Sequence, residues 1–171
     1  MTRTTPAASG GHVHGGILRV ADTPDLLDIT PTYADRFTLV TDVRADARRW
    51  AEATFEKGND RASRMLIFHT VLGLEVGPDD RPDAVAGWRI HASHATHVLL
   101  GAVGPGSVGR LLIETSAGSV SLTTAFAFHS RRRRFVWAQV SRIHRRLAAP
   151  TLRTGAALLQ GSGDDGAREA A

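Results

Sequence analysis

Hydrophobic and polar residues alternate with a period of two along several stretches of this chain, which is typical of strands with one buried face. The first such stretch is 36–43, where Phe37 and Leu39 share one side. After a loop at 77–83 the alternation returns at 86–91, 96–103, 109–115, 119–129 and 134–139. Because the connections between these five stretches are short, we expect hairpins and an antiparallel sheet of about six strands, with 119–129 near its centre.

Other stretches repeat hydrophobic residues every three or four positions, as helices with one buried face do. They are 46–57, 60–72 and about 140–159. Asp60 can cap the second of these helices and Gly73 can end it. Pro150 should kink the third, which we expect to bury Ile143 and Leu147.

The order of these elements predicts an α+β fold, with a strand, two helices, five hairpin-linked strands and a long C-terminal helix. The apolar face of such a sheet has to be covered, and the last helix is the only later segment long enough to cover it. We therefore expect a helix-grip fold, in which a curved antiparallel sheet wraps the C-terminal helix. Residues 1–25 should form a flexible leader, 26–159 the helix-grip domain and 160–171 a disordered tail.

Length and composition narrow the class of protein. A chain of 171 residues fits one domain, and 42% hydrophobic with 22% charged residues is typical of a globular protein. The lack of cysteine excludes disulfides and thiolate chemistry and favours the cytoplasm. We expect neither a signal peptide nor a membrane span. Among 21 lysines and arginines only Lys57 is a lysine, which indicates a GC-rich bacterial genome.

Four consecutive arginines at 131–134 are the densest charge in the sequence. Clustered positive charge attracts polyanions, so this run can bind phosphate groups. Between two predicted strands, however, such a run is expected to be a solvent-exposed loop. We therefore do not expect nucleic acid as a partner.

Scattered aromatic and apolar positions carry a resemblance to a known family. They are Tyr33, Ala34, Asp35 and Phe37, then 50–55, 98–101, 121–128 and 135–137, followed by His144, Arg145 and Arg146. These positions resemble an uncharacterised bacterial family, the domain of unknown function 2867, which is similar to the polyketide cyclase and START-type (SRPBCC) helix-grip superfamily. The resemblance implies a helix-grip fold over about 26–159 and an apolar cavity between sheet and helix. It implies no catalytic residues.

The residues expected to line this cavity are mostly aromatic or aliphatic. Trp88 with Ile90, and Phe126 with Phe128, are pairs two positions apart that share one face of a strand. The full predicted lining is Trp88, Ile90, Phe126, Phe128, Trp137, Ile143, His144, Leu147 and His69. A pocket of this composition would bind a small hydrophobic or lipid-like molecule without a cofactor.

Two other functions stay open. His144 or His69 would carry protons if the same cavity belonged to an enzyme of the cyclase, dehydratase or hydrolase type. A filled core would instead make the chain a structural or partner-binding module. Binding without catalysis is the favoured interpretation, and no catalytic residue is assigned. The pattern does not determine the ligand, the pathway or the oligomeric state.

Three histidines, His91, His94 and His97, are of the ligand type that zinc, copper and iron prefer. They span a predicted hairpin turn, so only the turn decides whether the rings converge. No acidic residue within the turn can orient them. We therefore expect no metal site.

The G-x-G-x-x-G spelling at 104–109 precedes no predicted helix, so we expect no dinucleotide cofactor either.

Overall fold

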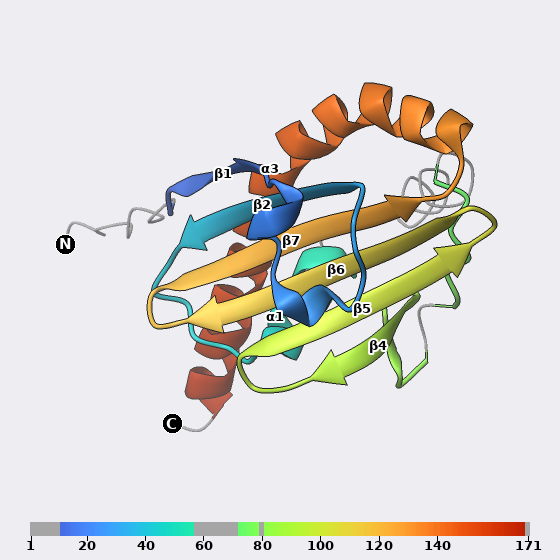
Figure 1. Cartoon of the computed structure of the whole chain (residues 1–171). Coiled ribbons are helices and arrows are strands. Elements are labelled where there is room, and N and C mark those ends of the chain that lie inside the picture. The colour runs from blue at the N-terminus through green and yellow to red at the C-terminus, as the bar shows by residue number, and fades with distance from the viewer. Residues whose placement is uncertain (1–10, 57–71, 79–80, 170–171) are drawn as a thin grey trace.

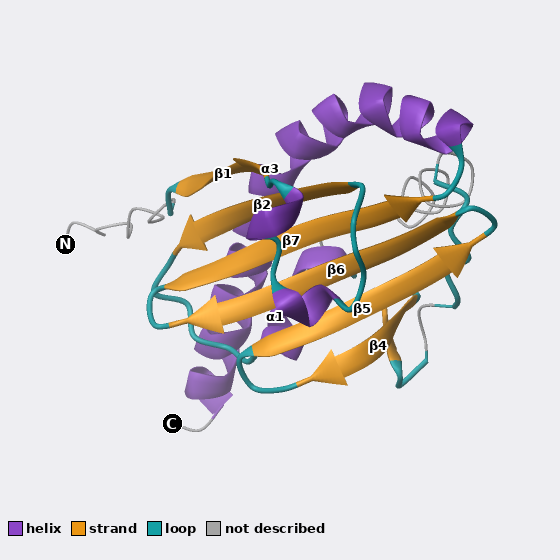
Figure 2. Ribbon diagram, in the orientation of Figure 1, coloured by secondary structure: helices purple, strands orange, loops and turns teal. Residues whose placement is uncertain are grey.

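The computed structural model describes residues 11–56, 72–78 and 81–169, with side chains of the last helix described as far as residue 162. Over these residues the chain forms a curved, open antiparallel sheet of seven strands and two α-helices (Figures 1 and 2). The strands are β1 (Val13–Ile17), β2 (Tyr33–Val40), β3 (Ala84–Val85), β4 (Trp88–Ser93), β5 (His97–Gly104), β6 (Ser107–Ser116) and β7 (Ser119–Phe128). The helices are α1 (Ala47–Phe55) and α3 (Arg131–Glu169). The expected α+β fold is confirmed.

The sheet has the order β1-β2-β7-β6-β5-β4-β3. Strands β4 to β7 follow one another as hairpins, because each turn between them is short. Strand β7 pairs with both β2 and β6, so it is an inner strand, as its clean alternation predicts. In the pairing of β2 with β7, Asp35 lies opposite Thr124 and Tyr33 lies opposite Phe126.

The first two strands differ from their predicted positions. Strand β2 is Tyr33–Val40, three residues earlier than the stretch 36–43. Strand β1, Val13–Ile17, lies within the expected leader and pairs with β2 at the edge of the sheet. Gly15 and Gly16 interrupt its alternation, so its sequence has no strand signal. The sheet therefore includes residues before 26.

The prediction of a strand at 134–139 is wrong, since these residues belong to α3. The arginines at 131–134 are likewise the first turn of this helix and not a hairpin loop. Phe135 and Trp137 alternate with polar residues, but a helix turns by about 200° over two residues and sends them to different sides. Accordingly Trp137 is buried and Phe135 is 67% exposed.

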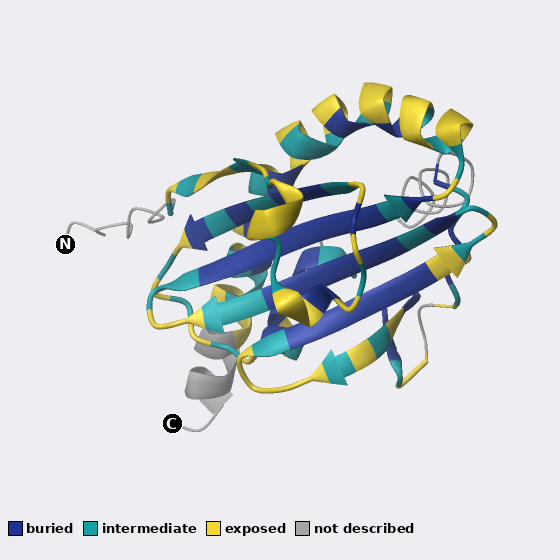
Figure 3. Cartoon of the chain, viewed as in Figure 1, coloured by how far each residue is buried: buried dark blue, intermediate teal, exposed yellow. Residues whose placement is uncertain are grey.

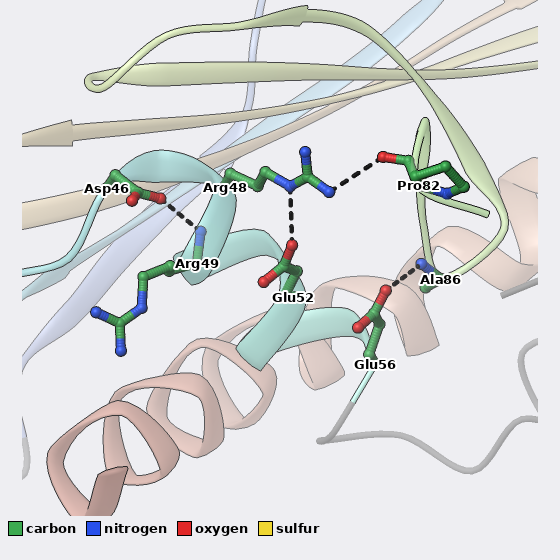
Figure 4. A network of polar contacts seen from close by, with 7 residues as sticks. All are labelled: Asp46, Arg48, Arg49, Glu52, Glu56, Pro82 and Ala86. Atoms are coloured by element: carbon green, nitrogen blue, oxygen red, sulfur yellow. Dashed lines mark hydrogen bonds and ion pairs between the residues drawn. The ribbon is translucent and has the colours of Figure 1, made fainter. Parts of the chain in front are cut away.

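Helix α1 confirms the helix expected at 46–57. Its N-cap is Asp46, whose carboxylate accepts a hydrogen bond of 2.8 Å from the backbone N–H of Arg49. Arg48 donates to the carbonyl of Pro82, and the backbone N–H of Ala86 donates to Glu56, both at 3.1 Å (Figure 4). These contacts join α1 to the segment around β3. The helix expected at 60–72 lies mostly outside the described residues.

The two faces of the sheet bury separate clusters. The helix face, on which α1 and α3 lie, packs strand residues such as Leu122 and Phe126 against Trp50 and Leu152. Figure 1 shows α1 and the red C-terminal part of α3 behind the sheet. The opposite face is covered by the segment between β1 and β2, whose Leu27 packs on a smaller cluster with Leu99. In Figure 3 the central strands are mostly dark blue, the colour of buried residues.

The residues through which helix α3 packs on the sheet differ from those that the sequence predicts. The buried residues described on this helix are Trp137, Ser141, Ala148, Leu152 and Gly155. Ile143 and Leu147, expected to be buried, are 58% and 52% exposed, so this prediction is wrong. Burial of Trp137 near the start of α3 sets the rotation of the helix and turns these two residues toward solvent. The helix continues through Pro150, and Figure 1 shows it changing direction between its orange and red parts.

Candidate functional site

A fully buried carboxylate lies on the helix face of the sheet. Asp35 on β2 is 0% exposed. It shares its side of the strand with Tyr33 and Phe37, because side chains two residues apart on a strand point the same way. A buried carboxylate is costly unless hydrogen-bond donors surround it. The donors around Asp35 therefore define the site.

The first donor is His144, which α3 carries across this part of the sheet. Its Nε2 lies 3.3 Å from Oδ2 and 3.4 Å from Oδ1 of Asp35. The His144 side chain is 26% exposed, so the ring joins the buried carboxylate to the surface. Among the described residues, its other nitrogen, Nδ1, has no hydrogen-bond partner.

The second donor is the phenol of Tyr33, whose Oη donates to Asp35 Oδ2 at 2.5 Å. Burial, and then the negative charge of Asp35, raise the pKa of Tyr33 well above its ordinary value. Tyr33 therefore stays protonated and acts as a donor to the carboxylate. Arg145 in turn donates to Tyr33 Oη through Nη1 at 3.4 Å.

Trp137 forms an aromatic wall beside this group. Its ring centroid is 5.3 Å from that of His144, 5.2 Å from that of Tyr33 and 4.7 Å from that of Phe126. Its indole Nε1–H is buried and has no hydrogen-bond partner among the described residues. The hydroxyl of Thr124, which lies opposite Asp35 in the sheet, is also buried without a hydrogen-bond partner among the described residues.

Unpaired buried polar groups are expensive, at about 1–3 kcal/mol each. Such groups next to an Asp–His pair are potential contacts for a polar molecule. The indole N–H would donate to an acceptor such as a carbonyl oxygen, while the hydroxyl of Thr124 can donate or accept. The arrangement can thus bind a polar group and exchange a proton with it.

The sequence predicts only part of this site. His144 is predicted, with Trp137 and Phe126 near it, and the structure brings these three side chains together. Asp35 enters only through the family resemblance, because the predicted strand begins one residue after it. With β2 beginning at Tyr33, an acidic residue stands in line with Tyr33, Phe37 and Leu39 on one side, and that was the available signal.

The other predicted lining residues have different surroundings. Trp88, Phe126 and Phe128 are buried in the core of the helix face, with the last two rings 5.6 Å apart. Gly109 makes room for them, since a Cβ there would lie 2.9 Å from the ring of Phe126 and 3.0 Å from that of Trp88. Ile90 is half-buried at the margin of this core. That these residues line a ligand cavity stays a prediction.

Two of the predicted lining residues do not join this core. Ile143 and Leu147 are on the solvent side of α3. His69 lies outside the described residues. A shallow hollow exists elsewhere, on the segment between β1 and β2. It is lined by Val20, Thr23, Pro24, Asp25, Asp28, Ile29, Thr30 and Pro31, none of which the sequence singles out.

The histidine triplet does not form one cluster. His91 Nδ1 lies 3.5 Å from Oδ2 of Asp28, a carboxylate that also pairs with the buried Arg110 at 2.6 Å. His94 and His97 face each other instead, with ring centroids 4.4 Å apart. Within the part of the chain that the structure describes, no three histidine, aspartate or glutamate side chains gather as a metal site would require.

Comparisons with known proteins leave the family open. No family model matches the chain, and no curated protein matches it. A solved structure, CalU16 from Micromonospora echinospora, aligns at 13% identity with a TM-score of 0.28 over 87% of this chain and 99% of that one. A TM-score this low carries no argument about function. None of the described helices is long and apolar enough to cross a membrane. The resemblance to the domain of unknown function 2867 is unconfirmed.

Proposed function

We propose that this chain binds a small molecule between the sheet and the first half of α3 and that His144 transfers protons to and from it. The observation that carries the proposal is the distance of 3.3 Å between Nε2 of half-buried His144 and Oδ2 of fully buried Asp35. A carboxylate in this position fixes the tautomer and the orientation of the imidazole. The other nitrogen is then the one that reacts.

The proton movements balance without a cofactor. Neutral His144 keeps its proton on Nε2, hydrogen-bonded to Asp35, and the lone pair on Nδ1 accepts a proton from a C–H or O–H group of the bound molecule. The resulting imidazolium returns this proton to another atom of the same molecule. Isomerisation, cyclisation and dehydration all follow this scheme. Trp137 Nε1–H would hold the oxygen on which negative charge develops.

A binding protein without catalysis is the second candidate. The observation in its favour is the aromatic, apolar surrounding of His144, where the ring centroids of Phe126, Phe128 and Trp137 lie 4.7–6.3 Å apart. Such a core favours a small ligand at the margin near His144 over a large lipid in the interior. Retention of the ligand without its conversion would identify this case.

The lack of cysteine in the chain supports a cytoplasmic location, which we also propose.

Incubation of the full chain with a small-molecule extract of bacterial cells tests the proposal. Mass spectrometry would follow all compounds over time for the wild type, for His144→Gln and for His129→Gln. His129 is an exposed histidine in the turn before α3 and is the matched control. We expect one compound to fall and another to rise with the wild type and the control, and neither to change with His144→Gln.

Two results would count against catalysis. The first is an extract that stays unchanged with the wild type while native mass spectrometry finds a compound retained by it, which is the result for a binding protein. The second is conversion by His144→Gln at the wild-type rate. In that case His144 only ties α3 to β2.

A further inference from the structure

The first 32 residues of α3 have a charge pattern that its contacts within the chain do not explain. From 131 to 162 the helix contains no aspartate or glutamate. Over the same range it contains the arginines 131, 132, 133, 134, 142, 145, 146 and 153. Within the described residues none of them forms an ion pair with a carboxylate. Arg145 and Arg153 donate hydrogen bonds within the chain, to Tyr33 Oη and to the carbonyl of Gly11, and the charge of the other arginines is available to an outside partner.

The position of the first four arginines makes the pattern more unusual. They occupy the first turn of α3, where the positive end of the helix dipole disfavours further positive charge. No acidic residue in that turn compensates for them. A local arrangement that opposes helix stability is expected where it serves a function. The positive dipole end and the arginines together attract anions.

Large apolar side chains are exposed on the same helix. Phe135, Ile143 and Leu147 are 67%, 58% and 52% exposed. At about 100° per residue, these three lie within roughly one third of the helix circumference, away from buried Ala148 and Leu152. Figure 3 shows the outward side of the first turns of α3 in yellow. Helix α3 is therefore amphipathic on its solvent side as well, with apolar residues flanked by arginines.

We propose that this solvent side of α3 binds the surface of a membrane that contains anionic lipids. The surface is defined by Arg131, Arg132, Phe135, Arg142, Ile143, Arg146 and Leu147. Arginines would contact the phosphate groups, and the apolar side chains would enter the boundary between head groups and acyl chains. The helix would lie in the plane of the membrane, in keeping with its lack of an apolar spanning stretch.

The combination of charge and apolar exposure favours lipid over the other anionic partners. A nucleic acid would engage the arginines but would leave Ile143 and Leu147 in water, since its backbone offers phosphate and sugar. A second copy of the chain would bring two arginine-rich helices together, and their like charges would repel. Of these three partners, the lipid surface alone uses both features.

Sedimentation with vesicles tests the proposal on the full chain. We expect binding to vesicles of phosphatidylcholine with about a third of phosphatidylglycerol, little binding to phosphatidylcholine alone, and weakening as salt is raised. The apolar variant, Phe135→Ser with Ile143→Ser and Leu147→Ser, should bind at least about tenfold more weakly although its charge is unchanged. The control is Val20→Ser with Val103→Ser, two exposed valines on other elements, which should bind as the wild type does.

Several results would overturn the proposal. Equal binding of the apolar variant and the wild type would show attraction by charge alone. Tighter binding to a DNA duplex than to the anionic vesicles at the same salt, unaffected by the apolar variant, would identify a nucleic acid partner. A concentration-dependent dimer that the apolar variant abolishes would identify a second copy. Circular dichroism of every variant establishes that it is folded, which we expect because the altered residues are exposed.

Discussion

Asp35 and His144 are 109 residues apart in the sequence, and the structure places Oδ2 of the first 3.3 Å from Nε2 of the second. The contact links β2 to α3 and gives a fully buried carboxylate a donor from the opposite layer. Tyr33 supplies another donor from the strand itself. The group therefore combines a structural tie with the chemistry proposed for His144, and stability and activity measurements separate the two roles.

Replacing Asp35 should destabilise the fold. In Asp35→Ala the Tyr33 hydroxyl and the His144 ring lose their common acceptor, and we expect the free energy of unfolding to fall by about 1–3 kcal/mol. Urea unfolding measures the difference. Asp42→Ala is the control, because Asp42 is exposed and has no such donors among the described residues, and it should change the stability by less than about 0.5 kcal/mol. Similar values for the two variants would mean that the contact contributes nothing.

Tyr33 should ionise only in strongly alkaline solution. It is the single tyrosine of the chain, so ultraviolet absorbance reports its ionisation alone. Because burial and Asp35 raise the pKa of its phenol, the native protein should show no tyrosinate signal near pH 10, where an unperturbed tyrosine is half-ionised. Asp35→Asn should move the transition to lower pH. A midpoint near pH 10 in the folded wild type would contradict the geometry.

The raised pKa of Tyr33 also has a consequence for stability. The unfolded chain can release the phenolic proton above about pH 10, whereas the folded chain keeps it. The folded state therefore binds more protons in this range, and its stability falls as the pH rises above the ordinary pKa. Tyr33→Phe should lack this part of the pH dependence. Thermal unfolding of both proteins between neutral pH and the alkaline range tests the difference.

Leucines on the two sides of α3 should differ in their effect on stability. Leu152 is fully buried in the main core, so Leu152→Ala should cost about 2–5 kcal/mol. Leu147 is 52% exposed, and Leu147→Ala should stay within about 0.5 kcal/mol of the wild type. Urea unfolding of the pair measures the rotation of α3 on the sheet. The opposite order would mean that α3 packs through the stripe that its sequence predicts.

Two glycines of α3 test its contact with α1. A Cβ at Gly155 would lie 2.6 Å from Oγ1 and 3.3 Å from Cα of Thr54, so Gly155→Ala should be destabilising. At Gly161 no atom of the described residues lies within 4 Å, and Gly161→Ala should stabilise the helix by up to about 1 kcal/mol. Thermal unfolding compares them. Thr54→Ala should lessen the cost of Gly155→Ala in the double variant, and a purely additive result would contradict the close approach.

The sequence by itself determined the elements whose signals are local. Alternation over about ten residues and short turns predict β5, β6 and β7, because a strand with one buried face needs that period and a hairpin needs few residues. The apolar spacing over 46–57 predicts α1 for the same reason, since a helix with one buried face needs a period of three to four residues. These signals do not depend on what the element packs against.

The tertiary structure alone decided the remaining features. The stretch 134–139 is too short to separate a strand period from a helix period, and the burial of Trp137 on the sheet settled both its conformation and the rotation of α3. That rotation exposes Ile143 and Leu147 and brings His144 to Asp35. No local pattern reports such a contact, because a buried carboxylate finds its donors from whichever element the packing brings against it.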